Sequence, residues 1–292
     1  MTKLPKPAIT AVDVLLTAAG HVKEPLSSNL KNEAVKCALT KAEKAYEDCI
    51  ADNHVHTIAA SHDIAGVVPK VDAIKIYGKL GKLPYKSSTY RGYLLDLAAR
   101  TKCAYCGHNT PSELDHYLPK SRFAEYAFSP INLIPSCAHC NSVSHKGEHS
   151  PTCVADTLFH PYFDDADDER WLYVKLWVER NGIVAKYYAQ KPHCWTSCKF
   201  DKISFSFKKF GLSEVYAMDI ISNLNSLRTS LGNLYAFGAI SRLKEFFSDN
   251  SRFMLESSKN NWIGVAYEFI ANDENLCRNY PAWFPDNTQI TR

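Results

Sequence analysis

The 292-residue sequence lacks long apolar runs, an excess of one charge, internal repeats and low-complexity segments. No window approaches the roughly 18 apolar residues of a membrane span, so we expect no membrane association. The N-terminal lysines are not followed by the apolar core of a secretion signal. The 34 basic and 31 acidic residues leave a net charge of only +3, which excludes a histone-like polycation. Any binding of nucleic acid must therefore use a local basic patch.

Cysteine, by contrast, is abundant, with ten in the chain. Such a content indicates either a disulfide framework or a metal site. A disulfide framework requires export, and the N-terminus carries no export signal. We therefore expect a cytoplasmic protein with reduced thiols, and this expectation favours a metal site.

The composition divides the chain into three regions. We expect a helical region at residues 1–100, a region rich in cysteine, histidine, proline and asparagine at 101–165, and a β-hairpin with further helices at 166–292. The central region has too little apolar material for a core of its own, so something else must hold it. The sequence therefore predicts an α+β protein.

Local patterns support this division. Trp171–Val178 and Ile183–Ala189 flank Asn181-Gly182, a strong tight-turn signal, and predict a hairpin. We interpret the stretch from Trp171 to Trp177 as sheet core rather than as a surface for stacking bases. Thr89 ends a hydroxyl-rich run that is typical of a helix cap. Apolar residues recur at helical spacing in Glu33–Ile50, Val71–Leu80, Tyr90–Ala99, Leu212–Leu231, Tyr235–Phe247 and Asn260–Ala271.

Two Cys-x-x-Cys pairs bracket the central region, Cys103 with Cys106 and Cys137 with Cys140. One such turn presents two thiolates to an ion, and two turns complete the tetrahedron that Zn²⁺ prefers. A single pair would fit a redox motif equally well. Two pairs around a segment without its own core predict a structural zinc site.

The other six cysteines show no such pattern. His193, Cys194 and Cys198 lie close together in the sequence, but no fourth ligand accompanies them, so we expect no second metal site. The remaining four are expected to be buried apolar thiols: Cys37, Cys49, Cys153 and Cys277.

Between and after the cysteine pairs stand Asp115-His116, Asn132, Asn141 and Lys146-Gly147. This order resembles the HNH endonuclease family, which is built on the ββα-metal fold. The resemblance implies two short strands followed by a helix around the zinc site, embedded between mainly helical N- and C-terminal regions. It extends loosely to a bacterial subgroup that includes nucleases of anti-phage systems such as Septu and certain retrons.

The residue types suit the hydrolysis of a phosphodiester. Asp115 offers a hard oxygen to Mg²⁺ or Mn²⁺, and His116 titrates near neutrality and can take a proton from water. They are adjacent, so a regular strand would point them to opposite sides, and twist or a bulge at the strand end must bring them together. Asn132 can hold the imidazole or its loop. Asn141, in the first turn of the last helix, is the expected second metal ligand, which His145 could replace or join.

Lys120, Arg122 and Lys146 are the nearest basic residues for contacts with DNA phosphates. The resulting hypothesis is a DNA endonuclease that acts in anti-phage defence. A zinc-dependent module that binds nucleic acid or protein without chemistry is the alternative. The large helical flanks are expected to dock a sensor or ATPase partner, a second copy of the chain, or the substrate.

Overall fold

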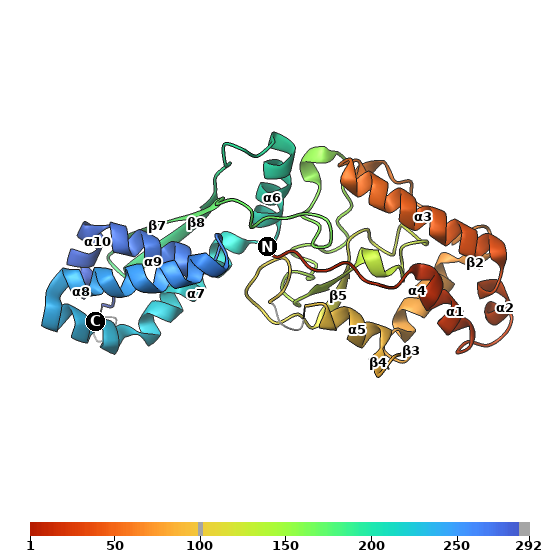
Figure 1. Cartoon of the computed structure of the whole chain (residues 1–292), viewed down its shortest axis with the longest axis horizontal. Coiled ribbons are helices and arrows are strands. Elements are labelled where there is room, and N and C mark those ends of the chain that lie inside the picture. The colour runs from red at the N-terminus through yellow and green to blue at the C-terminus, as the bar shows by residue number, and fades with distance from the viewer. Residues whose placement is uncertain (99–101, 286–292) are drawn as a thin grey trace. The chain divides into compact units, whose positions relative to one another are not determined.

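The computed structural model describes residues 1–98 and 102–285. The chain divides into two compact units, residues 1–166 with 197–210 and residues 167–196 with 211–292 (Figure 1). The N-terminal helices and the cysteine-rich region share the first unit. The division into three domains stays a prediction.

The first unit combines helices with short antiparallel hairpins (Figure 1). Side-chain caps begin three of its helices at Thr10, Asn32 and Thr89, and the sequence predicted the last of these. Its helices are α1 (Ala11–Ala19), α2 (Leu26–Leu30), α3 (Glu33–Ala51), α4 (Lys70–Lys79), α5 (Tyr90–Asp96) and α6 (Ser197–Lys209), with 3₁₀ turns at Val55–Thr57, Pro130–Asn132 and Val154–Asp156. Its strands are β1 (Asp63–Ile64), β2 (Val68–Pro69), β3 (Pro84–Tyr85), β4 (Ser88–Thr89), β5 (Glu113–His116) and β6 (Leu133–Ser136).

The apolar sides of the N-terminal helices form one hydrophobic core in this unit. Val14, Leu39 and Leu94 are fully buried within it. Leu114 of β5 and Leu133 of β6 belong to the same core. The helices therefore hold one face of the β5–β6 hairpin, which we call the site hairpin.

The second unit contains the hairpin that the sequence predicted. β7 (Leu172–Glu179) pairs with β8 (Gly182–Ala189) over eight positions, and Gly182 has a φ of 113°, which glycine tolerates best. Helix α7 packs against β8 and α9 packs against β7. The helices are α7 (Leu212–Ser226), α8 (Arg228–Ser257), α9 (Trp262–Asn272) and α10 (Glu274–Arg278), followed by a 3₁₀ turn at Tyr280–Ala282.

The helix boundaries in this unit differ from prediction most clearly at α8, which also continues to Ser257, ten residues beyond the predicted end at Phe247. The sequence predicted a break between Leu231 and Tyr235, but the break falls at Leu227 and α8 runs unbroken for 30 residues. Gly232 lies inside α8, where it brings the backbone close to the hydroxyl of Tyr280. Tertiary packing here overrides the weak helix propensity of glycine. Among the described residues no helix is long and apolar enough to cross a membrane.

Candidate active site and zinc site

The four cysteines of the two Cys-x-x-Cys pairs lie together in the first unit. All four are buried, and their sulfur atoms lie within 4.8 Å of one another. Gly107, with a φ of 61°, turns the first pair, and its N–H donates to the carbonyl of Cys103 at 2.7 Å. Four buried thiols at this spacing fit a structural zinc ion.

Backbone and amide groups donate to these sulfurs as zinc-bound thiolates require. The N–H of Asn109 donates to Sγ of Cys106 at 3.4 Å, and that of Cys137 donates to Sγ of Cys103 at 3.3 Å. Hydrogen bonding with the Cys103 thiol lowers the pKa of Cys106 to about 7. The thiolate form, which binds metal, is therefore favoured at Cys106.

The other cysteines do not join a metal site among residues 1–98 and 102–285, where the four-cysteine cluster is the one possible group found. Cys194 is exposed and Cys198 is half-buried. Of the four thiols expected to be buried, only Cys277 is; Cys37 and Cys153 are exposed and Cys49 is half-buried. Cys37 and Cys49 lie on α3 away from its buried stripe, which the helical period decides.

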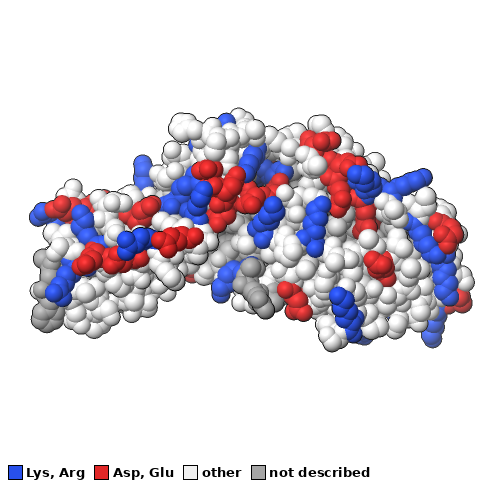
Figure 2. Space-filling view, viewed as in Figure 1, with Lys and Arg blue, Asp and Glu red and all other residues white. Residues whose placement is uncertain are grey.

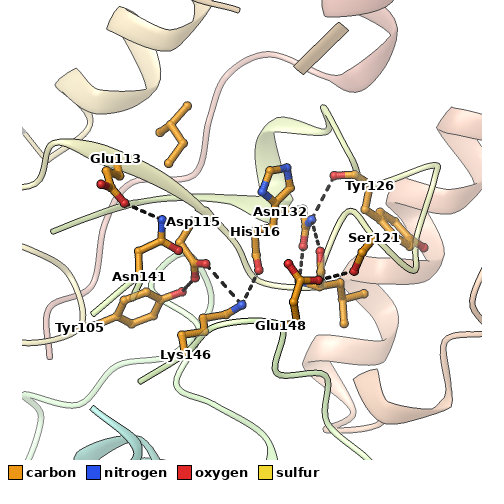
Figure 3. A network of polar contacts seen from close by, with 12 residues as sticks. Tyr105, Glu113, Asp115, His116, Ser121, Tyr126, Asn132, Asn141, Lys146 and Glu148 are labelled. Carbon is orange, nitrogen blue, oxygen red and sulfur yellow. Dashed lines mark hydrogen bonds and ion pairs between the residues drawn. The ribbon is translucent and has the colours of Figure 1, made fainter. Parts of the chain in front are cut away.

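The site hairpin pairs β5 with β6 in regular antiparallel register through its last residue. Asp115 faces Ile134 and His116 faces Leu133, with no bulge between them. Alternation along the strand therefore sends Glu113 and Asp115 to one face and His116 to the other (Figure 3). The twist or bulge expected to unite Asp115 and His116 is not present.

Asp115 is the buried charge of the site, with 2% of its surface exposed. Its Oδ2 accepts from the hydroxyl of Tyr105 at 2.8 Å, and its Oδ1 lies 3.3 Å from Nζ of Lys146. Desolvation raises the pKa of Asp115, while Lys146 opposes that shift. The same Nζ donates to the carbonyl of His116 at 2.5 Å, so Lys146 ties the carboxylate to the end of β5 (Figure 3).

Asn141 lies on the same face as Asp115. Its Nδ2 donates to Oε2 of Glu113 at 2.7 Å, which leaves the amide Oδ1 as an oxygen donor for a ligand. The expected helix around Asn141 is absent, because residues 138–148 form consecutive turns. Serines at 142 and 144 favour turns over helix, and Gly147 has a φ of 49° that ends any helical continuation.

His116 lies on the opposite face, beneath the N-terminal helices. Its Nε2 lies 2.8 Å from the carbonyl of Ala127, and its ring packs edge-on against Tyr77 at 4.3 Å. A carbonyl only accepts, so Nε2 carries the proton and Nδ1 is the basic nitrogen. Burial, assisted by the charge of Lys120, lowers the pKa of His116 to about 3. The imidazole is therefore neutral at physiological pH.

Asn132 holds the loop after β5 rather than the imidazole. Its Oδ1 accepts from the N–H of Leu118 at 2.7 Å. Its Nδ2 donates to the carbonyls of Leu118 at 2.9 Å and Tyr126 at 3.0 Å (Figure 3). The side chain is fully buried, and this set of bonds fixes the path of residues 118–126 around the site.

The remaining residues expected at the site are dispersed. Lys120 lies over the ring of Tyr77 at 4.9 Å, beside His116, and Arg122 is exposed. His145 packs on His139 at 4.0 Å between ring centres. Lys146, expected to contact phosphate, is instead 1% exposed in its ion pair with Asp115.

Two contributors were not assigned from the sequence. Tyr105 lies inside the first Cys-x-x-Cys turn, and nothing in its spacing points to Asp115. Glu113 carries a usable signal, because it stands two residues before Asp115 and strand alternation places both on one face.

Comparison with known proteins matches the segment that contains the two cysteine pairs and Asp115. Residues 103–147 match the HNH endonuclease family, so the chain carries an HNH endonuclease domain, as the resemblance implied. Over 301 aligned residues the chain is 25% identical to "Protein ea31" of Escherichia phage lambda, and the alignment covers 95% of this chain and 99% of that protein. No solved structure matches the chain.

Proposed function

We propose that the protein is a metal-dependent endonuclease that hydrolyses phosphodiester bonds in DNA. The observation that carries this proposal is the buried carboxylate of Asp115, flanked by Glu113 and Asn141 inside the matched HNH segment. A buried carboxylate requires a positive partner, and Lys146 supplies one here. Mg²⁺ or Mn²⁺ would take that place through Oδ1 of Asn141 and the carboxylate of Asp115.

The cation, when bound, would stabilise the charge that develops on the phosphate and on the leaving 3′ oxygen. Release of Lys146 would also free the carbonyl of His116, to which it donates. The imidazole lies on the other face, so it reaches the attacking water only if the end of β5 turns and the hydrogen bond to Ala127 breaks. Nδ1 of His116 would then take the proton of the attacking water, while Nε2 keeps its own.

Substrate contacts in this proposal come from Lys120 and Arg122, which lie on the loop that Asn132 holds. Figure 2 shows basic and acidic side chains intermixed on the face in view, without a large basic field there. With a net charge of +3, affinity for phosphates is expected to be weak without help. We therefore propose an effector that a sensor or ATPase partner, or a second copy of the chain, delivers to DNA.

A plasmid-cleavage assay with Mg²⁺ or Mn²⁺ tests the activity. Removing a general base typically costs 10²–10⁴-fold in rate, so His116→Ala should lose cleavage to that extent. His62→Ala, at an exposed histidine of the same unit, is the matched control and should cleave like the wild type. Equal cleavage by wild type and His116→Ala would refute the assignment.

We propose that the activity serves prokaryotic anti-phage defence. Phage plating on cells that express the protein with its neighbouring genes tests this role. Wild type should lower plating efficiency and His116→Ala should not. Equal plating on both strains would contradict the role in defence while leaving the nuclease activity to the plasmid assay.

A second candidate function is a zinc-stabilised binding module without chemistry. The placement of Asp115 and His116 on opposite faces of β5, with Lys146 already neutralising the carboxylate, favours it. This candidate requires Asp115→Ala and His116→Ala to retain function in cells, whereas Cys103→Ser should lose it.

A further inference from the structure

The hairpin of the second unit presents a face that differs from an ordinary solvent face. Alternation buries Leu172, Val174 and Leu176 and sends the next residues outward. We call the outward set the outer face. It comprises Tyr173, Lys175 and Trp177 from β7 and Val184, Lys186 and Tyr188 from β8.

Two lysines stand directly opposite each other at the centre of the outer face. Lys175 and Lys186 are register partners, and both are exposed. Like charges in this position destabilise a hairpin, and among the described residues neither lysine forms an ion pair with an acid. An arrangement that costs stability and has no internal partner fits an anionic ligand.

Aromatic rings border the lysine pair on both sides. Tyr173 and Tyr188 stack across the strands with centroids 5.9 Å apart. At the next outward position in the other direction, Trp177 is 37% exposed. Successive outward positions lie about 7 Å apart, so rings and ammonium groups alternate along one line.

The expectation that the whole stretch from Trp171 to Trp177 is sheet core holds for Trp171, which is buried, and is wrong for Trp177.

We propose that the outer face binds single-stranded nucleic acid. This inference rests on the proposed function, in that it names a second contact for the substrate of the nuclease. Lys175 and Lys186 would contact successive phosphates, and Trp177 would stack on a base. The exposed indole favours a single strand over a duplex, because only unpaired bases offer their faces for stacking.

Fluorescence anisotropy with a labelled single-stranded DNA oligonucleotide tests the proposal on the full chain. No divalent cation is added, so cleavage does not contribute and the zinc site stays intact. Lys175→Glu with Lys186→Glu should weaken binding at least tenfold and lower the slope of log affinity against log salt by about 1.4, since each phosphate contact contributes about 0.7. Trp177→Ala should weaken binding roughly 5- to 150-fold, the range for loss of one stacked base.

Matched controls separate the outer face from general charge and folding effects. Lys41→Glu with Arg242→Glu changes the net charge equally at exposed positions on α3 and α8, and Phe253→Ala removes an exposed ring from α8. All variants should unfold at temperatures close to the wild type. Losses confined to the outer-face variants support the proposal.

Wild-type affinity in the outer-face variants, or equal losses in the controls, would overturn the proposal, as would preference for duplex over single strand. The result is independent of the nuclease test. A protein that cleaves nothing yet binds single strands through the outer face would refute the proposed activity and retain this inference.

Discussion

The site hairpin and the β7–β8 hairpin differ in length and in how their residues are buried. The site hairpin is four residues long in each strand, and every residue of it except Glu113 is buried. The β7–β8 hairpin is twice as long and alternates between buried and outward residues. Helices cover one side of each, through Leu114 in the first case and through α7 and α9 in the second.

The contrast shows two ways to stabilise a two-stranded sheet, which is marginal alone. The short hairpin depends on polar groups buried around it, namely four thiols, the Asp115–Lys146 pair and the amide of Asn132. The long hairpin depends on apolar burial on one face and leaves the other for solvent. Loss of a buried polar partner should therefore damage the first hairpin far more than any outward change damages the second.

Removal of the zinc site should have the largest effect, because it should unfold the unit that contains the site hairpin and leave the β7–β8 hairpin intact. Structural zinc contributes on the order of 10 kcal/mol to small domains, so Cys103→Ser should abolish stable folding of the first unit. Metal analysis of purified protein should show one zinc per chain in the wild type and none in the variant, and the thermal transition should shift or vanish.

Cys153→Ser, at an exposed thiol of the same unit, serves as the control and should retain both zinc and stability. A wild-type protein that is zinc-free and stable would disprove the four-cysteine zinc site.

The buried ion pair should give the next largest effect. Lys146→Met leaves Asp115 as an uncompensated buried carboxylate, at a cost of about 3–5 kcal/mol in the free energy of unfolding. Adding Asp115→Leu should recover much of that loss, because it removes the buried carboxylate that Lys146→Met leaves without a positive partner. Urea unfolding of the two variants measures the recovery. Independent, additive losses would show that the pair is not coupled.

Acid should destabilise the first unit through its buried histidines. Burial holds the pKa of His160 well below its usual value, and its Nε2 lies 2.9 Å from the hydroxyl of Tyr46, which donates to Asn132. The unfolded chain takes up this proton near pH 6.5, so the stabilisation is present above that pH and is lost as pH falls below it. Each such histidine contributes a slope of about 1.4 kcal/mol per pH unit.

His160→Gln should therefore reduce the slope of unfolding free energy between pH 6 and pH 5 by about one proton, whatever its effect at neutral pH. His62→Gln, at an exposed histidine, should leave the slope unchanged. An unaltered slope in His160→Gln would show that His160 takes up its proton in the folded state.

The sequence predicted those parts of the contrast that depend on spacing along the chain. The Cys-x-x-Cys pairs predicted the cysteine cluster, and alternation around Asn181 predicted the long hairpin. Strand alternation places adjacent residues on opposite faces, and Asp115 and His116 follow this rule in the structure. The expected helix at Asn141 fails because serines and Gly147 terminate it.

The missing parts depend on contacts between residues far apart in the chain. Lys146 lies 31 residues after Asp115, and nothing in the sequence distinguishes a lysine that neutralises a buried carboxylate from one that contacts phosphate. The same holds for His116, whose environment is decided by Tyr77 from α4 and the carbonyl of Ala127. The order of the motifs along the chain predicts which residues belong to the candidate site, whereas tertiary packing decides the surroundings of each side chain.

The smallest predicted effect has the opposite sign and sharpens the contrast. Lys186→Glu converts the like-charged pair with Lys175 into an attractive one, so it should stabilise the second unit by about 0.2–1 kcal/mol. Urea unfolding at low salt should show the gain, and high salt should diminish it because both groups are exposed. Lys41→Glu, without a cross-strand partner, should show no such salt-dependent gain. A variant that is more stable yet binds single-stranded DNA more weakly would indicate that the lysine pair is kept for its ligand, whereas a loss of stability would mean that the two ammonium groups do not repel across the strands.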